Sequence, residues 1–131
     1  NKIIDMEIKK TGKLFSFCAM VPVIIKDKDV KVINFFQKMG SDIGLLFQIA
    51  DDLIDYRGLV KKVGKKTKKD QGKGKATLIS LLGYKKAVKY SDKIQSKIVK
   101  NLKKYRLKSS NINETLSYIL AISKLKIIIN I

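Results

Sequence analysis

The sequence contains no histidine, no tryptophan, a single cysteine and a single proline. One cysteine cannot form an internal disulfide, and without histidine or a second cysteine the usual zinc sites cannot be built. The missing histidine also excludes Ser-His and Cys-His catalytic pairs. Any chemistry in this chain therefore depends on carboxylates, lysines, amides, hydroxyls and a bound metal.

Long apolar runs are missing as well. The longest run extends from Leu14 to Ile25 and includes Pro22, so it is too short to cross a hydrocarbon core of about 30 Å. We predict a core helix here and no transmembrane segment. Cys18 lies within this run, so we expect it to be a small buried side chain that stays reduced, which favours a cytoplasmic location.

The chain starts at Asn1, without an initiator methionine and without a basic-then-apolar leader. We therefore expect no signal peptide and interpret the chain as the middle of a longer protein.

Acidic residues are few: the chain has 11 Asp and Glu and 29 Lys and Arg, so its net charge is +18. This charge favours polyanionic partners, namely nucleic acid, anionic lipid headgroups or diphosphates, and a compositional bias toward lysine explains it as well. Only Arg57 and Arg106 are arginines, whereas proteins that read DNA sequence use the bidentate arginine fork for guanine. Charge alone does not select the partner.

Apolar residues recur at helical spacing along most of the chain, and no segment predicts a convincing strand. We therefore predict a single all-α domain. The expected helices cover residues 3–25, with a break near Thr11-Gly12, and residues 29–56, 77–82, 84–105 and 112–128. Residues 57–76 combine glycines with eight lysines and predict a basic loop with at most short helical turns.

Three carboxylates gather in one stretch of the second predicted helix. Asp51 and Asp55 are four residues apart on one helix face, Asp52 is adjacent, and Gln48, three residues before Asp51, shares that face. A bound Mg²⁺ is the simplest way to reduce the repulsion between these like charges. In proteins this ion binds one or two carboxylates together with waters and phosphate oxygens. A helix end or a solvated helix face is the alternative.

A segment rich in lysine and glycine, residues 64–77, follows these acids. Metal-bearing acids and nearby lysines can hold a diphosphate from both sides, because the metal bridges oxygens and the ammonium groups neutralise the remaining charge. The segment is not a Walker loop, since the Gly-x4-Gly-Lys-Ser/Thr pattern after a strand is absent. A solvated basic loop is the alternative.

Several of these motifs occur in an order that resembles the trans-polyprenyl diphosphate synthases. Phe-Gln-Ile-Ala-Asp-Asp-Leu-Ile-Asp at 47–55 resembles the second aspartate-rich motif of that family, and Lys10-Thr11-Gly12 resembles its lysine-threonine motif. Gly-Lys at 64–65, Lys-Asp at 69–70, Lys-Ala-Thr at 75–77 and Leu-Leu-Gly at 81–83 resemble the downstream region. Lys66 and Lys68 depart from the family pattern inside the loop.

The resemblance implies an all-α helical bundle of the isoprenoid synthase type, of which residues 1–131 would be the carboxyl-terminal half of one domain. The first aspartate-rich motif, the residues that hold isopentenyl diphosphate and those that limit product length lie upstream in family members. The resemblance also implies a homodimer in the full-length protein.

Roles for individual residues follow from the same resemblance. Asp51 would be the main Mg²⁺ ligand of this half, with Asp52 and Asp55 as a second ligand or as outer-shell support. The departing diphosphate of the allylic substrate would be bound by Lys10, Lys65 and Lys75. Thr11 and Gln48 would lie near the carbocation, and the expected catalytic set is Lys10, Thr11, Gln48 and Lys65.

The implied function is a short-chain trans-prenyltransferase, which condenses an allylic diphosphate with isopentenyl diphosphate to make geranyl, farnesyl or geranylgeranyl diphosphate. Gly12 favours the short-chain group, because longer-chain members more often have alanine there. We expect the isolated chain to be inactive without the opposing motif.

The alternative is a non-catalytic subunit that binds a diphosphate or a partner chain. A nucleic-acid binder is disfavoured, because arginine is scarce and the unmetallated aspartates would repel phosphate.

Overall fold

The computed structural model describes residues 2–63, 77–104 and 110–124, and within these ranges every regular element is a helix. The elements are α1 (Lys2–Glu7), η1 (Ile8–Gly12), α2 (Lys13–Ile25), α3 (Val30–Val63), α4 (Leu78–Leu82), α5 (Tyr84–Lys104) and α6 (Ser110–Lys124). The all-α prediction is therefore confirmed for the described residues.

The first three elements form a continuous helical path with a π-helical stretch, η1, between two α-helices. The sequence predicts a break near Thr11-Gly12, and the structure has a π-turn there instead of an interruption. Short π-helical stretches are rare and occur frequently at functional sites. The path ends after Ile25, and Asp27 then adopts a left-handed conformation with φ of 48°.

Helix α3 is the longest element, with 34 residues and a length of about 50 Å at 1.5 Å per residue. It begins one residue later than expected and continues to Val63. The prediction of a loop over residues 57–76 is therefore wrong for residues 57–63, which extend α3. The remainder of that predicted loop, residues 64–76, lies outside the described residues.

Helices α4, α5 and α6 match the predicted helices within a few residues. Thr77 caps α4, because its hydroxyl accepts from the Ser80 N–H at 3.1 Å and the Ser80 hydroxyl accepts from the Thr77 N–H at 3.0 Å. Gly83 ends α4 with φ of 78°, a conformation that glycine adopts without strain. Helix α6 begins at Ser110, two residues earlier than the spacing predicts.

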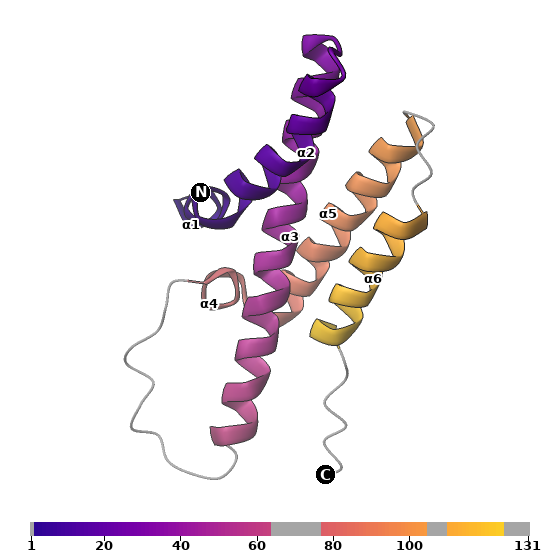
Figure 1. The fold of residues 1–131 in the computed structure, drawn as a ribbon. Helices are drawn as coiled ribbons and strands as arrows, with labels where there is room; N and C mark the ends of the chain where they lie inside the picture. The colour runs from indigo at the N-terminus through magenta and orange to yellow at the C-terminus, as the bar shows by residue number, and fades with distance from the viewer. Residues whose placement is uncertain (1, 64–76, 105–109, 125–131) are drawn as a thin grey trace.

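The ribbon places α3 at the centre, with the antiparallel pair α5 and α6 on one side and α1 and α4 on the other, while α2 runs along one end of α3 (Figure 1). The core lies where α3 meets α4, α5 and α6. Its largest fully buried apolar side chains are Leu46, Ile49, Leu53, Leu78, Ile98, Leu102 and Leu120.

The apolar run on α2 behaves differently from expectation. Cys18 is exposed, so the prediction of a buried thiol is wrong. Ser16 and Val23 are the buried residues of this helix, and the Ser16 hydroxyl donates to the carbonyl oxygen of Gln37 at 2.8 Å. No helix among the described residues has the length and apolar character needed to cross a bilayer.

Candidate active site

Glycines allow the path from η1 into α2 to approach α3 closely. A Cβ atom at Gly44 would stand 2.7 Å from the Cα atom of Gly12, and a Cβ atom at Gly40 would stand 2.4 Å from the carbonyl oxygen of Phe15. Larger side chains at positions 40 and 44 would force the helices apart. Residues 40, 44, 48 and 52 are spaced by four on α3 and follow one side of the helix, so this contact determines what surrounds Gln48.

Two hydrogen bonds in series connect η1 with the aspartate-rich turn of α3. The Thr11 hydroxyl donates to Gln48 Oε1 at 3.0 Å, although the two residues are 37 positions apart. Gln48 Nε2 then donates to Asp52 Oδ1 through a longer bond of 3.4 Å. The structure thus brings together Thr11 and Gln48, which the motifs predict to share one site. The polar partner of Gln48 on α3 is Asp52, four residues on, and not Asp51.

Asp52 is largely removed from solvent, with 8% of its surface exposed. Its Oδ2 atom is buried and makes no hydrogen bond with the described part of the chain. Burial raises the pKa of the Asp52 carboxyl above its usual value, and the neighbouring charge of Asp51 adds to the rise. The hydrogen bond from Gln48, the backbone N–H of Leu78 and the charge of Lys10 act in the opposite direction.

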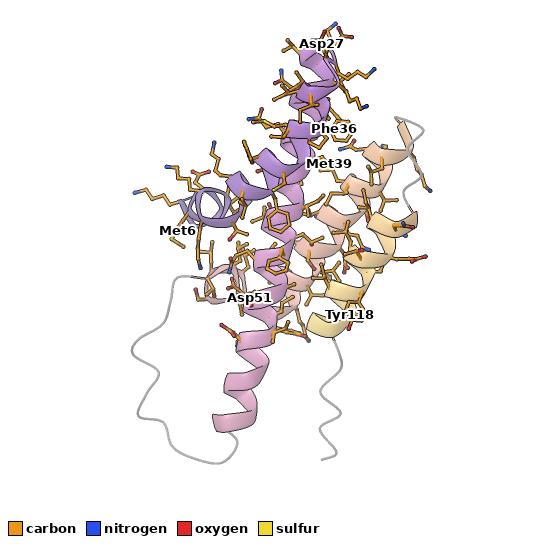
Figure 2. All side chains as sticks on the ribbon, in the orientation of Figure 1. Met6, Asp27, Phe36, Met39, Asp51 and Tyr118 are labelled. Carbon is orange, nitrogen blue, oxygen red and sulfur yellow. The ribbon has the colours of Figure 1, made fainter. Side chains whose placement is uncertain are left out.

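Asp51 and Asp55 are both exposed and lie one turn apart on α3, and Figure 2 shows Asp51 at the level of α4. In the described part of the chain, no cluster of three or more acidic, histidine or cysteine side chains is arranged to hold a metal ion. Mg²⁺ does not need such a cluster, because one or two carboxylates suffice when waters and phosphate oxygens complete the shell. The exposed oxygens of Asp51 and Asp55 have the chemistry for this kind of binding.

Of the three lysines predicted to bind diphosphate, the structure describes Lys10 alone. Lys10 is an exposed residue of η1, and its charge reaches the Asp52 carboxyl, whose pKa it lowers. Lys65 and Lys75 lie outside the described residues, so their convergence with Asp51 stays a prediction.

An apolar pocket of about 300 Å³ lies beside α3 and is lined by Phe47, the neighbour of Gln48 in sequence. Phe15 of α2 and Phe47 of α3 line it with their ring centroids 5.7 Å apart, and α6 closes the far side with Ile112 and Leu116. Phe17 of α2 does not line this pocket and is 55% exposed.

Sequence reasoning missed two features that shape this site. One is the pair Gly40 and Gly44, whose spacing of four, continued by Gln48 and Asp52, was a detectable signal for a close helix contact. The other is the start of α4, where the capped first turn brings the backbone N–H of Leu78 to the Asp52 carboxyl. No sequence signal connects Leu78 with Asp52, because their proximity depends on how α4 packs.

The chain is similar to known proteins in sequence and in fold. The family model of the polyprenyl synthetases matches residues 1–119. A farnesyl diphosphate synthase from Bacillus subtilis (strain 168) is 38% identical over 74 residues, which are 56% of this chain and 25% of that protein. A decaprenyl-diphosphate synthase from Dictyostelium discoideum is 40% identical over 68 residues, which are 52% of this chain and 15% of that protein.

A solved structure has a similar fold. The crystal structure of a geranyltransferase from Helicobacter pylori 26695 matches with a TM-score of 0.66 and 22% identity, covering 94% of this chain and 39% of that chain. The chain thus spans less than half the length of these relatives. Because the family model extends over most of its residues, the chain belongs to the polyprenyl synthetase family.

Proposed function

We propose that this chain carries the carboxyl-terminal half of the active site of a magnesium-dependent, short-chain trans-prenyltransferase. The observation that carries the proposal is the 3.0 Å hydrogen bond from Thr11 to Gln48. This bond sets the lysine-threonine motif beside the aspartate-rich turn, as a shared substrate site requires. The substrates would be an allylic diphosphate and isopentenyl diphosphate.

In the proposed reaction, the bond between the allylic carbon and the diphosphate oxygen breaks, and its electron pair leaves with the diphosphate. The double bond of isopentenyl diphosphate attacks the resulting cation, and loss of a proton gives a trans product that is five carbons longer. Lys10, Lys65 and Lys75 would stabilise the negative charge on the leaving group. The oxygens of Thr11 and Gln48 would stabilise the positive charge on carbon.

Mg²⁺ held by Asp51 and Asp55 would supply Lewis-acid neutralisation of the departing diphosphate. Both carboxylates are exposed, so they can bind an ion that keeps most of its water shell. From the family resemblance we also propose a homodimer for the full-length protein and a cytoplasmic location.

The test is binding of geranyl diphosphate to the purified 131-residue chain, measured by calorimetry with and without Mg²⁺. We expect binding that requires Mg²⁺, and an Asp51→Ala variant that binds at least about tenfold more weakly, a loss of 1.4 kcal/mol or more. Glu114→Ala, which removes an exposed carboxylate from α6, is the matched control and should bind normally. Binding that ignores Mg²⁺ or that survives Asp51→Ala would contradict the proposal.

A second candidate function is a non-catalytic subunit that binds a partner chain. Its support is a group of large apolar side chains exposed on α2 and at the start of α3: Leu14 64%, Phe17 55%, Ile25 75% and Val30 69%. Contiguous exposed apolar surface is typical of sites that another protein covers. We expect no turnover by the chain alone, and product formed from geranyl and isopentenyl diphosphates would exclude this candidate.

A further inference from the structure

The two carboxylates of the adjacent pair Asp51 and Asp52 have different surroundings, although both belong to the same motif. Asp51 is exposed, whereas Asp52 is 8% exposed and its Oδ2 atom has almost no contact with solvent. Successive residues of a helix point about 100° apart. Asp52 therefore continues the row of Gly44 and Gln48 toward η1, while Asp51 and Asp55 remain in solvent.

The oxygens of Asp52 are poorly placed to bind a hydrated ion. Its Oδ1 atom already accepts the hydrogen bond from Gln48, and its Oδ2 atom is enclosed by protein. Mg²⁺ gives up its water reluctantly and keeps several molecules when proteins bind it. An ion with that shell reaches the exposed Asp51 without displacing protein, and it reaches Asp52 only if the packing opens.

The hydrogen bonds around Gln48 have a defined direction. A carboxylate accepts and does not donate, so Asp52 draws the NH₂ group of Gln48 toward itself. The opposite amide orientation would place Gln48 Oε1 against the carboxylate oxygens. With Nε2 held by Asp52, Oε1 faces Thr11 and accepts the hydrogen bond from its hydroxyl at 3.0 Å.

This direction determines which part of Thr11 is offered to a ligand. Because its hydroxyl proton is directed to Gln48, the lone pairs of Oγ1 point away from that bond. Electron-rich oxygen of this kind stabilises positive charge, whereas a hydroxyl that offers its proton would oppose it. The negative charge of Asp52 at the other end polarises both bonds in the same sense.

We propose that Asp52 is a positioning residue, which fixes the Gln48 amide so that the Thr11 hydroxyl presents its oxygen lone pairs to the reacting carbon, and that it does not bind the metal. This inference rests on the proposed function for its reaction. The orientation of Gln48 itself does not depend on that function. Asp51 and Asp55 are left as the metal-binding carboxylates of this turn.

The direct test is the side-chain amide signal of Gln48 in NMR spectra of the purified chain with ¹⁵N-labelled glutamine. We expect the two NH₂ protons to be well separated and slow to exchange in the unsubstituted chain. Asp52→Ala should bring them to the values of a solvated glutamine. Asp52→Asn should retain the separation, because the Asn Oδ1 atom can accept the same hydrogen bond. Asp55→Asn is the matched control and should leave the Gln48 signal unchanged.

A second readout separates positioning from metal binding. Geranyl diphosphate binding in Mg²⁺ should weaken by less than about twofold in Asp52→Asn and by about tenfold or more in Asp51→Asn. Equal losses in the two variants would make Asp52 a metal ligand and overturn the proposal. A Gln48 signal that Asp52→Ala does not move would overturn it as well. If the Ala variant does not fold, the binding comparison of the two Asn variants still tests the proposal.

Failure of the proposed function can be recognised separately. If the unsubstituted chain does not bind geranyl diphosphate in Mg²⁺, the prenyltransferase assignment fails, and the role of Asp52 in that reaction fails with it. The NMR readout requires no ligand, so it still shows whether Asp52 fixes the Gln48 amide.

Discussion

Gly44 of α3 lies against Gly12 of η1 so closely that a Cβ atom on Gly44 would stand 2.7 Å from the Gly12 Cα atom. The contact is not symmetric, because a Cβ atom on Gly12 would stand 3.4 Å from its nearest neighbours, Ile8 Cγ2 and Ser41 Oγ. Of these two glycines, only Gly44 therefore depends on the absence of a side chain. This close approach also brings Thr11, the neighbour of Gly12 in sequence, within hydrogen-bond distance of Gln48.

Replacing Gly44 with alanine should destabilise the fold by about 2 kcal/mol, because the added methyl group would push η1 away from α3. The measurement is the urea concentration at the midpoint of unfolding, compared at constant m-value. Gly12→Ala is the matched control and should cost less than about 1 kcal/mol, since its methyl group has room and alanine favours helix. Equal midpoints for the two variants would contradict the asymmetric contact.

The hydrogen bond between Thr11 and Gln48 should be measurable as a coupling energy. A double-mutant cycle with Thr11→Val and Gln48→Met removes the bond while keeping similar side-chain volumes. We expect an interaction of about 1 kcal/mol in unfolding free energy, the usual net value of a protein hydrogen bond. Thr115→Val, combined with Gln48→Met, is the control pair. It should show additive effects, because the Thr115 hydroxyl bonds within α6 to the Asn111 carbonyl oxygen.

Periodicity was sufficient to predict most helices, because apolar spacing marks each face that packs on a neighbour. It failed at residues 57–63, where Gly58 and two lysines indicated a loop. A helix that is already formed adds residues at little cost, so one glycine and two lysines do not end it. Cys18 was misplaced for another reason. The run 14–25 is apolar on nearly all sides, so its pattern does not indicate which face packs on α3.

The residues of the candidate site were easier to predict from the sequence than their arrangement in space. The motifs identified Thr11, Gln48 and Asp51, and the structure joins the first two directly. The burial of Asp52 was not predictable, because adjacent aspartates have the same local pattern. Only the packing of η1 and α4 distinguishes them. The lysine-rich residues 64–76 lie outside the described ranges, so their part of the site stays a prediction.

The ion pair that joins α5 to α3 should make a small contribution that depends on salt. Lys97 Nζ lies 2.6 Å from Asp42 Oδ2, and the lysine side chain is 46% exposed. Lys97→Met should therefore lower the unfolding free energy by less than about 1 kcal/mol. The loss should shrink in 1 M salt, where screening weakens the pair. Lys93→Met, one turn earlier on α5, is the control. An identical loss in both variants at both salt concentrations would show that the pair contributes nothing.

The buried carboxyl of Asp52 should give the protein a distinct dependence of stability on pH. Its pKa is raised in the folded state, chiefly by burial, so the folded protein binds the proton more tightly than the unfolded chain does. Stability from this group is present below the ordinary aspartate pKa and is lost as pH rises through the raised value. Asp52→Asn carries no titrating group at this position. The stability of this variant minus that of the unsubstituted chain should therefore increase as the pH rises from 4 to 7.

The measurement is the urea unfolding free energy of both proteins across this pH range, taken as a difference so that all other titrating groups cancel. Thr115→Val introduces no change in charge, so its difference from the unsubstituted chain should stay constant with pH. A constant difference for Asp52→Asn as well would mean that solvent reaches the carboxyl in solution. A difference of the opposite sign would mean that stabilising contacts outweigh burial at this carboxylate.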